Sequence, residues 1–201
     1  MLHGIGMTSQ RTRARMIERL REKGIRNEAV LKAMAAVPRH VFVEEALASR
    51  AYEDTALPLG MGQTISQPYV VARMIELLLN GRKTLGKTLE IGAGCGYQAA
   101  VLAQLTDEVY AVERLGPLLD KAKANMRTLK QFNVRLKHAD GQFGLPEAGP
   151  FDSIIVAAAG TQVPPALLMQ LAPGGRLVLP VGTDQQYLSF IEHTPQGYVE
   201  T

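Results

Sequence analysis

A glycine-rich segment, Gly92-Ala93-Gly94-Cys95-Gly96, follows a short apolar run, and an acid, Glu90, stands two residues before its first glycine. Glycines at such a turn adopt positive φ angles and allow a ligand to approach the main chain closely. Open parallel α/β sheets bind their ligands at the carboxyl ends of the strands, where this segment is expected to lie. The pattern therefore predicts a loop that binds a nucleotide-like cofactor.

Two further acids stand at the expected ends of the next two strands. Glu113 follows Gly92 by 21 positions, and Asp140 is followed by Gly141. A carboxylate placed like Glu113 accepts hydrogen bonds from ribose hydroxyls, and Asp140 is placed to accept one from an adenine amino group. The predicted cofactor site consists of residues of the loop and of the strand ends: Glu90, Gly92, Ala93, Gly94, Gly96, Glu113, Asp140 and Gly141.

The spacing of the glycines favours S-adenosylmethionine over a dinucleotide. A dinucleotide-binding turn reads G-x-G-x-x-G and directs a helix N-terminus at a pyrophosphate, but here Tyr97 occupies the position of the last glycine. Glu90 would repel a pyrophosphate, whereas it suits the ammonium and sulfonium charges of S-adenosylmethionine. No metal site is predicted, because the single cysteine, Cys95, and the four histidines show no ligand spacing.

Alternating strands and helices are expected to position this site. Strand-like and helical runs alternate from residue 87 onward, and this pattern predicts βαβ units with right-handed crossovers. The fold class is therefore predicted as α/β, with a doubly wound, mostly parallel, Rossmann-like sheet covered on both faces. The expected strands are 88–91, 109–112, 134–137, 153–157 and 177–181, and the expected helices are 97–105, 117–129 and 164–171.

The chain divides into three predicted regions. Residues 1–50 are expected to form a helical cap, with helices that begin after Ser9 and Asn27 and a short third helix at 41–47. Residues 51–68 are rich in Gly, Pro, Thr and Ser and are expected to form a long functional loop. Residues 69–201 are expected to form the cofactor-binding domain.

Charge and hydropathy exclude several classes of protein. The net charge of +3 separates into +5 in residues 1–50 and −2 in the remainder. Acidic and basic residues interleave in the cap, which is typical of a solvated helix face rather than a nucleic-acid-binding arm. The apolar runs are far shorter than the ~18 residues of a membrane span, and Met1–Gly6 is too short for a signal peptide. A cytoplasmic protein is predicted.

The expected fourth strand and the residues after it carry no catalytic base. Amine-methylating members of this fold class place an Asn/Asp-Pro-Pro-aromatic clamp there, whereas residues 151–160 read FDSIIVAAAG. Methyl transfer is an in-line displacement from an already activated donor, so the protein mainly aligns the acceptor. The missing base favours an acceptor that is nucleophilic at neutral pH, such as a carboxylate.

The segment Gly60–Tyr69, which reads GMGQTISQPY, carries the most specific motif. Its end is explained by a helix start, with Ser66 or Gln67 as the cap and Pro68 in the first turn, but a cap does not require the residues at 60–64. The whole segment resembles the signature of protein-L-isoaspartate O-methyltransferases. Residues 90–96, 139–141 and 177–182 match that family in the same order, so the resemblance covers about residues 9–192.

The resemblance implies a reaction and a set of residues. Such enzymes transfer a methyl group from S-adenosylmethionine to the free α-carboxylate of an isoaspartyl residue in damaged proteins and peptides. The ester then collapses to a succinimide. Carried over by position, Ser66 is the active-site hydroxyl, expected to hold the substrate carboxylate by a hydrogen bond in a monomeric enzyme. The substrate cleft is expected to pair with the main chain of an extended peptide and to be lined by Gln63, Thr64, Ile65, Leu179, Pro180 and Val181.

The sequence departs from the family pattern at two places. Cys95 stands where Ser or Thr is common, and the chain stops at Thr201, whereas family members continue into a strand with a Val-Arg-Phe-Val-Pro-Leu-like segment. A C-terminal truncation is therefore predicted. Two alternatives remain open from the residues alone: a methyltransferase for carboxyl or hydroxyl groups of small molecules, and a non-catalytic module that binds nucleic acid through its basic cap.

Overall fold

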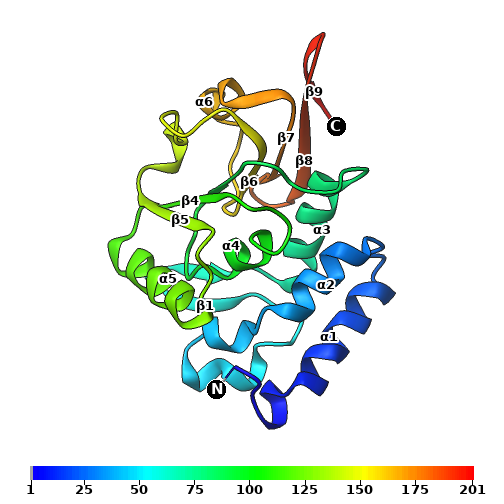
Figure 1. The fold of residues 1–201 in the computed structure, drawn as a ribbon, viewed down its shortest axis with the longest axis vertical. Helices are drawn as coiled ribbons and strands as arrows, with labels where there is room; N and C mark the ends of the chain where they lie inside the picture. Colours follow the sequence, from blue (N-terminus) through cyan, green and yellow to red (C-terminus); the bar gives the residue numbers. More distant parts are fainter. Residues whose placement is uncertain (1) are drawn as a thin grey trace.

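A seven-stranded sheet forms the centre of the protein in a computed structural model that describes residues 2–201 (Figure 1). The strand order is β5-β4-β3-β6-β7-β8-β9, with the first five parallel and β8 and β9 added by antiparallel pairing. The predicted α/β class with a mostly parallel sheet is confirmed. The strands are β3 (Thr88–Ile91), β4 (Val109–Glu113), β5 (Val134–His138), β6 (Phe151–Val156), β7 (Leu171–Val181), β8 (Tyr187–Thr194) and β9 (Gly197–Glu200).

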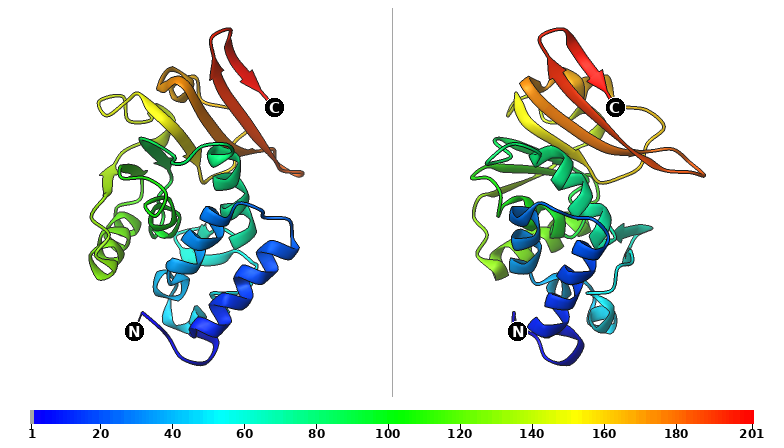
Figure 2. Two further views of the ribbon diagram at one scale, coloured as in Figure 1. Left: turned by 45° about the vertical axis from the view of Figure 1, so that its right-hand side comes forward. Right: turned by 90° about the vertical axis from the view of Figure 1, so that its right-hand side faces the viewer.

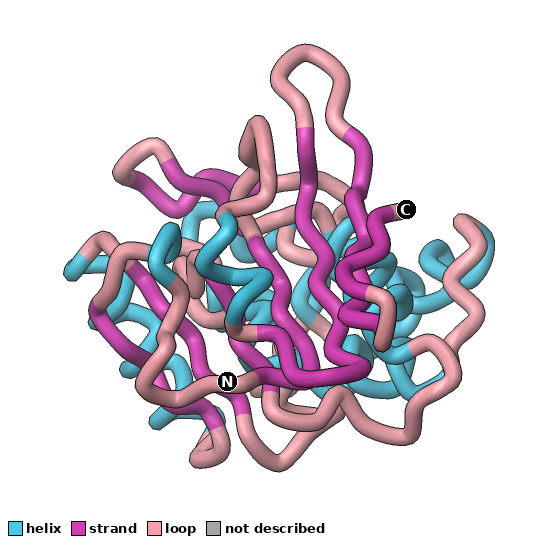
Figure 3. Tube along the Cα trace, turned by 90° about the horizontal axis from the view of Figure 1, so that it is seen from above, coloured by secondary structure: helices cyan, strands magenta, loops and turns pink. Residues whose placement is uncertain are grey.

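Helices cover the two faces of the sheet unequally. One face packs against α3 (Pro68–Leu79), α4 (Tyr97–Leu102) and α5 (Gly116–Leu129). The other is covered by α6 (Pro165–Met169) and by Leu145, which follows the short 3-10 helix η4 (Gly141–Phe143). Alternation along the strands supplies both cores, because successive side chains point to opposite faces. Figure 3 shows the strands side by side, with the connecting loops at their ends.

The five expected strands and three expected helices exist, with shifted ends. The helix expected to reach Leu171 ends at Met169, and Leu171 instead begins β7 by pairing with Phe151. No element is predicted for residues 187–200, where β8 and β9 form an antiparallel extension of the sheet. Within residues 2–201, no helix is both long and apolar enough to cross a membrane.

The helical cap begins as its capping residues predict. Helix α1 (Gln10–Glu22) starts after Ser9, whose side chain accepts the Thr12 N–H, and α2 (Glu28–Ala36) starts after Asn27, which accepts from Ala29 and Val30. The helix expected at 41–47 is wrong. Two 3-10 helices, η2 (Arg39–Phe42) and η3 (Glu45–Arg50), replace it because the chain is extended at Val43 between them. The first residue of the predicted cap, Met1, lies outside the described residues.

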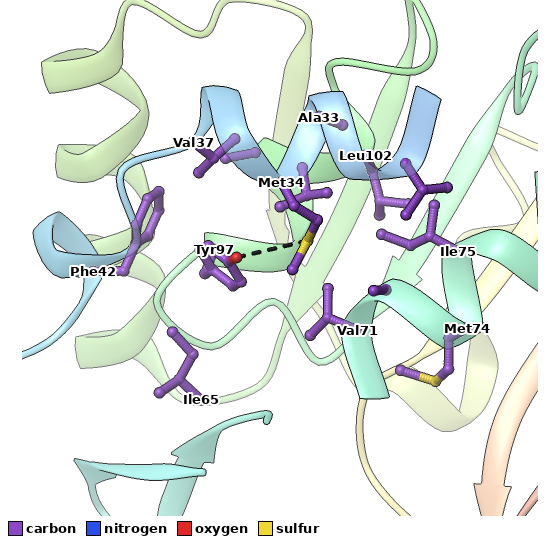
Figure 4. Packing of buried hydrophobic residues seen from close by; sticks show 14 of the residues in the cluster. Ala33, Met34, Val37, Phe42, Ile65, Val71, Met74, Ile75, Tyr97 and Leu102 are labelled. Carbon is purple, nitrogen blue, oxygen red and sulfur yellow. Dashed lines mark hydrogen bonds between the residues drawn. The ribbon is translucent and has the colours of Figure 1, made fainter. Parts of the chain in front are cut away.

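The cap shares one hydrophobic core with the sheet. Tyr97, the first residue of α4, packs edge-on against Phe42 of η2 at 5.5 Å between ring centroids. Its hydroxyl donates to the sulfur of Met34 in α2 at 3.7 Å (Figure 4). The same cluster extends from Met16 of α1 to Val178 of β7. The cap and the sheet therefore do not have separate cores. This holds even though α1 and α2 lie well away from the edge strands β8 and β9 (Figure 2).

A β-hairpin occupies much of the segment predicted to be a loop. Strands β1 (Leu57–Gly60) and β2 (Gln63–Ile65) pair antiparallel around a turn in which Gly60, Met61 and Gly62 have φ of 82°, 56° and 72°. Two glycines make this left-handed turn accessible. The hairpin forms because Leu57 and Leu59 alternate with exposed residues and insert into the core.

Candidate active site

A cavity of about 1250 Å³ opens where the carboxyl ends of the parallel strands meet the hairpin and α3. Chain segments that follow β3, β4, β5 and β6 form one side, together with residues of β7. Residues 62–64, 66 and 67 and one face of α3 form the other. Strand β3 lies next to β6, and the connections that leave these two strands run in opposite directions across the sheet, from β3 to β4 and from β6 to β7. This is the topological position at which open α/β sheets bind their ligands.

The glycine loop contributes main chain to this cavity at two of its glycines. Gly92 and Gly94 line it with φ of 87° and 55°. A Cβ built on Gly94 would lie 3.4 Å from Cδ1 of Leu59, so the loop comes close to the hairpin here. Cys95 is buried, and burial raises the pKa of its thiol to about 11. Its thiol therefore stays protonated, consistent with a small side chain that fills space.

Ala93 and Gly96 do not line the cavity, unlike the prediction. Ala93 is buried beside Ala99 and Ala111. Gly96 has φ of 90°, and a Cβ there would lie 2.9 Å from Cε of Met126 in α5. Small residues at these two positions therefore allow the loop to pack closely against neighbouring parts of the protein. They are not needed for a ligand to approach the loop.

The two strand-end acids both line the cavity. The buried Glu113 accepts the N–H of Gly94 at Oε2 (2.9 Å) and those of Arg114 and Leu115 at Oε1 (2.9 and 3.1 Å). Asp140 accepts the N–H of Gln142 at 3.0 Å and thereby caps η4. Each carboxylate oxygen has further acceptor capacity. The predicted pair is thus brought together at neighbouring strand ends.

Gly141 also lines the cavity, for a steric reason. A Cβ at this position would lie 2.4 Å from Cγ2 of Ile91 at the end of β3. The glycine therefore allows the segment after β5 to approach β3 beside Asp140.

Glu90 lies away from the cavity, contrary to its prediction as a ligand contact. Strand alternation turns it to the face opposite Leu89 and Ile91, where it is fully buried. Neither of its carboxylate oxygens has a hydrogen-bond partner within residues 2–201, and the side-chain amide of the nearby Gln98 is likewise unpaired. Burial raises the pKa of Glu90 to about 8. Its electrostatic influence on a ligand is therefore indirect, from within the core.

The hairpin brings the other predicted residues to the cavity with one exception. Gln63, Thr64 and Ser66 line it, and Ser66 is half-buried with no hydrogen bond from its hydroxyl to any described residue. Ile65 points the opposite way, as β2 alternation requires, and is buried in the core (Figure 4). The prediction that its side chain lines the cleft is wrong.

The β7 segment forms a wall of the cavity but offers no open edge. Leu179 and Pro180 line the cavity, whereas Val181 is buried in the second core. Residues 179–181 pair with β8 on one side, and Gly160 occupies the other, donating its N–H to the Pro180 carbonyl at 3.2 Å. The expectation that a peptide main chain pairs with this segment is wrong, because both of its edges are already paired.

Asp54 is a residue that the sequence analysis misses. Its Oδ1 accepts the N–H of Tyr69 at 3.0 Å and its Oδ2 accepts the side-chain amide of Gln67 at 3.1 Å. Lys23 of α1 forms an ion pair with the same carboxylate. Burial acts in the opposite direction, but Lys23 and the N–H donors lower the pKa of Asp54.

The expected cap of α3 by Ser66 or Gln67 is therefore wrong. Gln67 occupies the N-cap position but makes no side-chain capping bond, and Asp54 supplies the acceptor from 15 residues away in sequence. This leaves the Ser66 side chain available to the cavity. No local pattern signals so distant a cap, since capping signatures involve residues within one helical turn.

Arg39 is a second residue that sequence reasoning does not single out. Its guanidinium is fully buried, donates to the carbonyls of Ala51 (2.7 Å) and Thr55 (3.3 Å), and lies 4.8 Å from the ring centroid of Tyr97. It therefore ties the segment that leads into the hairpin to the start of α4, directly after the glycine loop.

The residues around the cavity fit S-adenosylmethionine. Gly92 and Gly94 leave open main chain, Glu113 and Asp140 provide acceptors at adjacent strand ends, and residues 157–159 form an uncharged alanine wall. Among residues 2–201, no group of three or more His, Cys, Asp or Glu side chains lies close enough together to hold a metal ion.

Comparison with known proteins identifies several relatives. The family model described as protein-L-isoaspartate(D-aspartate) O-methyltransferase (PCMT) matches residues 11–201. A protein-L-isoaspartate O-methyltransferase of Dechloromonas aromatica is 92% identical over 201 residues, which are 100% of this chain and 93% of that protein. A Methylobacillus flagellatus protein of the same name is 63% identical over 192 residues, 96% of this chain and 86% of the relative.

A solved structure has the same fold. A Plasmodium falciparum protein described as a protein-L-isoaspartate O-methyltransferase, in complex with S-adenosyl-L-homocysteine, is 26% identical and superimposes with a TM-score of 0.81. The match covers 94% of this chain and 92% of that chain.

Proposed function

This chain belongs to the protein-L-isoaspartate(D-aspartate) O-methyltransferase family, and on that premise we propose how its residues divide the work. The protein is an S-adenosylmethionine-dependent methyltransferase that acts on the free α-carboxylate of L-isoaspartyl residues and thereby initiates repair through a succinimide. Gly92, Gly94, Glu113 and Asp140 bind the cofactor, and the hairpin with Ser66 binds the substrate. The observation that carries this division is the single cavity that both groups of residues line.

The chemistry needs alignment more than acid or base catalysis. S-adenosylmethionine supplies a methyl group activated by its sulfonium charge; a substrate carboxylate oxygen forms the new bond to carbon as the carbon–sulfur bond breaks, and S-adenosylhomocysteine leaves. The substrate carboxylate is already ionised at neutral pH. What the chain supplies is therefore geometry and the exclusion of water.

Glu113 holds the ribose and Asp140 the adenine amino group in this proposal. Three N–H groups fix the carboxylate of Glu113, including that of Gly94 in the glycine loop. A ligand bound to Glu113 is thereby coupled to the loop position. Asp140 is fixed in the same way by its cap of η4.

Ser66 holds the substrate carboxylate. Its hydroxyl is half-buried, lines the cavity and is not used by another described residue. It donates a hydrogen bond to one carboxylate oxygen and leaves the other oxygen directed toward the methyl group. Ser66 forms no covalent bond in this role, so it requires no partner base.

The main chain of the substrate pairs with β2. Strand β2 belongs to a two-stranded sheet with β1 as its only strand partner in residues 2–201, so its second edge is open. Edge strands of this kind accept an extended peptide through main-chain hydrogen bonds. This mode reads main chain rather than side chains, which suits an enzyme that meets damage in many sequence contexts.

We further propose that the enzyme acts as a monomer in the cytoplasm on damaged or unfolded proteins. One chain provides residues for both ligands at one cavity, and its single cysteine is buried and free. Sedimentation at working concentration tests the monomer, and fractionation of cells tests the location.

The central experiment compares an isoaspartyl peptide with its aspartyl twin, using labelled S-adenosylmethionine. Only the isoaspartyl peptide is expected to acquire label, and equal labelling of both contradicts the proposal. Ser66→Ala is expected to lower kcat about 10- to 100-fold, the order for losing a hydrogen bond to a charged group, with unchanged cofactor affinity. Ser49→Ala, at an exposed position outside the cavity, is the matched control.

A further inference from the structure

Arg73 lies on the face of α3 that borders the substrate side of the cavity. Tyr69, Val70 and Arg73 all line the cavity, and their spacing of three and four residues places them on one helical face. The opposite face is buried, with Val71, Met74 and Ile75 inserted in the core. After the first turn of α3, Arg73 is thus the residue of this helix that a bound peptide would contact.

The charges around the cavity are distributed unevenly. Glu113 ends β4, Arg114 follows it, and Asp140 follows β5, all on the side assigned to the cofactor. Among the described residues that line the cavity, Arg73 is the one charged side chain on the hairpin and α3 side. A cation at that place favours an anionic group in whatever ligand occupies it.

A partly buried acid, Glu76, fixes the direction of the Arg73 side chain. Its Nη1 donates to Oε1 of Glu76 at 3.0 Å. Oε2 of Glu76 accepts the main-chain N–H groups of Arg26 (2.8 Å) and Asn27 (3.0 Å) in the turn between α1 and α2. Glu76 is therefore a fixed anchor, and it draws the guanidinium toward the C-terminal end of α3, away from Ser66.

The remaining donors of Arg73 are available to a ligand. Its Nε and Nη2 make no hydrogen bond with a described residue, and 41% of the side chain is exposed. An arginine held by one nitrogen can still donate hydrogen bonds from its other nitrogens to a second carboxylate. The planar guanidinium matches the geometry of a carboxylate group.

The position along α3 separates this second carboxylate from the one that is methylated. Arg73 lies five residues after Pro68, where α3 begins, which is about 7.5 Å at a helical rise of ~1.5 Å per residue. Ser66 lies two non-helical residues before Pro68, so roughly 10 Å separates the two positions. An extended peptide advances ~3.3 Å per residue, so that distance corresponds to about three residues of substrate. The partner of Arg73 is therefore not the carboxylate held by Ser66.

We propose, resting on the function proposed above, that Arg73 is a specificity-determining residue that binds an acidic side chain about three residues from the isoaspartyl residue. The enzyme then favours damaged segments with a nearby glutamate or aspartate. The preference acts on substrate binding, so it is expressed in KM more than in kcat.

The test uses isoaspartyl peptides that carry Glu or Gln at the third position on one side or the other of the damaged residue. The wild-type enzyme is expected to use one Glu peptide roughly three- to tenfold better in kcat/KM than its Gln twin, the range for a partly exposed charged pair. In Arg73→Gln this ratio falls to about one. In Arg15→Gln, which removes an exposed positive charge outside the cavity, the ratio is retained.

Three outcomes overturn the proposal: no preference in the wild-type enzyme for either Glu peptide, a preference retained by Arg73→Gln, or an equal loss in Arg15→Gln. Two measurements extend the test if Arg73→Gln folds poorly. Raising the ionic strength must reduce the wild-type ratio, and Arg73→Glu must favour a Lys peptide over a Glu peptide. Failure of the proposed function looks different, because then no isoaspartyl peptide is labelled at all.

Discussion

The side of the cavity proposed to bind the cofactor and the side proposed to bind the substrate, called below the cofactor side and the substrate side, are built in different ways. On the cofactor side, Glu113 is fixed by the N–H groups of Arg114 and Leu115 next to it and by the adjacent loop, and Asp140 is fixed by a residue two positions away. On the substrate side, Ser66 and α3 depend on Asp54, whose own partner, Lys23, belongs to the cap. The acids of one side are therefore held by main-chain N–H groups, whereas the start of α3 on the other side is held by an acid that is itself paired with the helical cap.

The helical cap holds the substrate side in place. Lys23 pairs with Asp54, the turn after α1 holds Glu76, and Arg39 holds the segment that leads into the hairpin. All three contacts reach the substrate side, and Arg39 also contacts Tyr97 directly after the glycine loop. Damage to cap contacts should therefore impair substrate use before cofactor binding, and the following variants test that separation.

The largest loss of cofactor binding is expected from Gly94→Val, which alters the glycine loop on the cofactor side. Its φ of 55° is unfavourable for a β-branched residue, and a Cβ would point toward Leu59 at 3.4 Å. We expect loss of measurable cofactor binding by calorimetry. Gly81→Val, with φ of 74° but open space around it and outside the cavity, is the control for strain alone. Full activity of Gly94→Val would refute the role of the loop.

Glu113→Ala is expected to have the next largest effect. It removes the proposed ribose acceptor and also frees the Gly94 N–H, so cofactor binding should weaken by about 1–3 kcal/mol, the order for a hydrogen-bonded charged group. The measurement is the cofactor Kd, with Asp107→Asn at an exposed acid as the control. An unchanged Kd would show that Glu113 only supports the loop.

Asp54→Asn probes the substrate side and should leave the cofactor side intact. The substitution removes the negative charge that pairs with Lys23, and it weakens the hydrogen bonds that position 54 accepts from Gln67 and Tyr69. We expect kcat/KM for an isoaspartyl peptide to fall about fivefold, corresponding to ~1 kcal/mol for a partly exposed pair, with an unchanged cofactor Kd. A matching loss of cofactor affinity would contradict the separation of the two sides.

Glu90→Gln should have the smallest effect on turnover and a clear effect on stability. The folded protein holds the proton of Glu90 up to about pH 8, whereas an ordinary glutamate releases it near 4.5. Between these values unfolding releases a proton, so this group makes the free energy of unfolding fall as pH rises. Denaturant unfolding at several pH values between 5 and 8 should show a weaker decline in Glu90→Gln. Identical declines in both proteins would exclude the buried, protonated state of Glu90.

The parts of the fold that follow local patterns could be predicted from sequence. Ser9 and Asn27 start α1 and α2 as capping residues do, and the strands at 88–91 and 109–113 follow runs of apolar residues. Local patterns do not predict the hairpin at 57–65. Its turn includes Met61 with φ of 56°, and its strands form because Leu57 and Leu59 are buried against helices that are distant in sequence.

By itself the sequence determined the α/β class, the family and the placement of Gly92, Gly94, Glu113, Asp140 and Ser66 at one site. Each of those conclusions rests on spacing within a strand, a turn or a motif. Only the tertiary structure decided that Glu90 and Ile65 face the core, that β7 has no open edge, and that Asp54 rather than Ser66 caps α3. The physical reason is that burial and hydrogen-bond partnership depend on which segments the folded chain brings together, and spacing along the sequence does not contain that information.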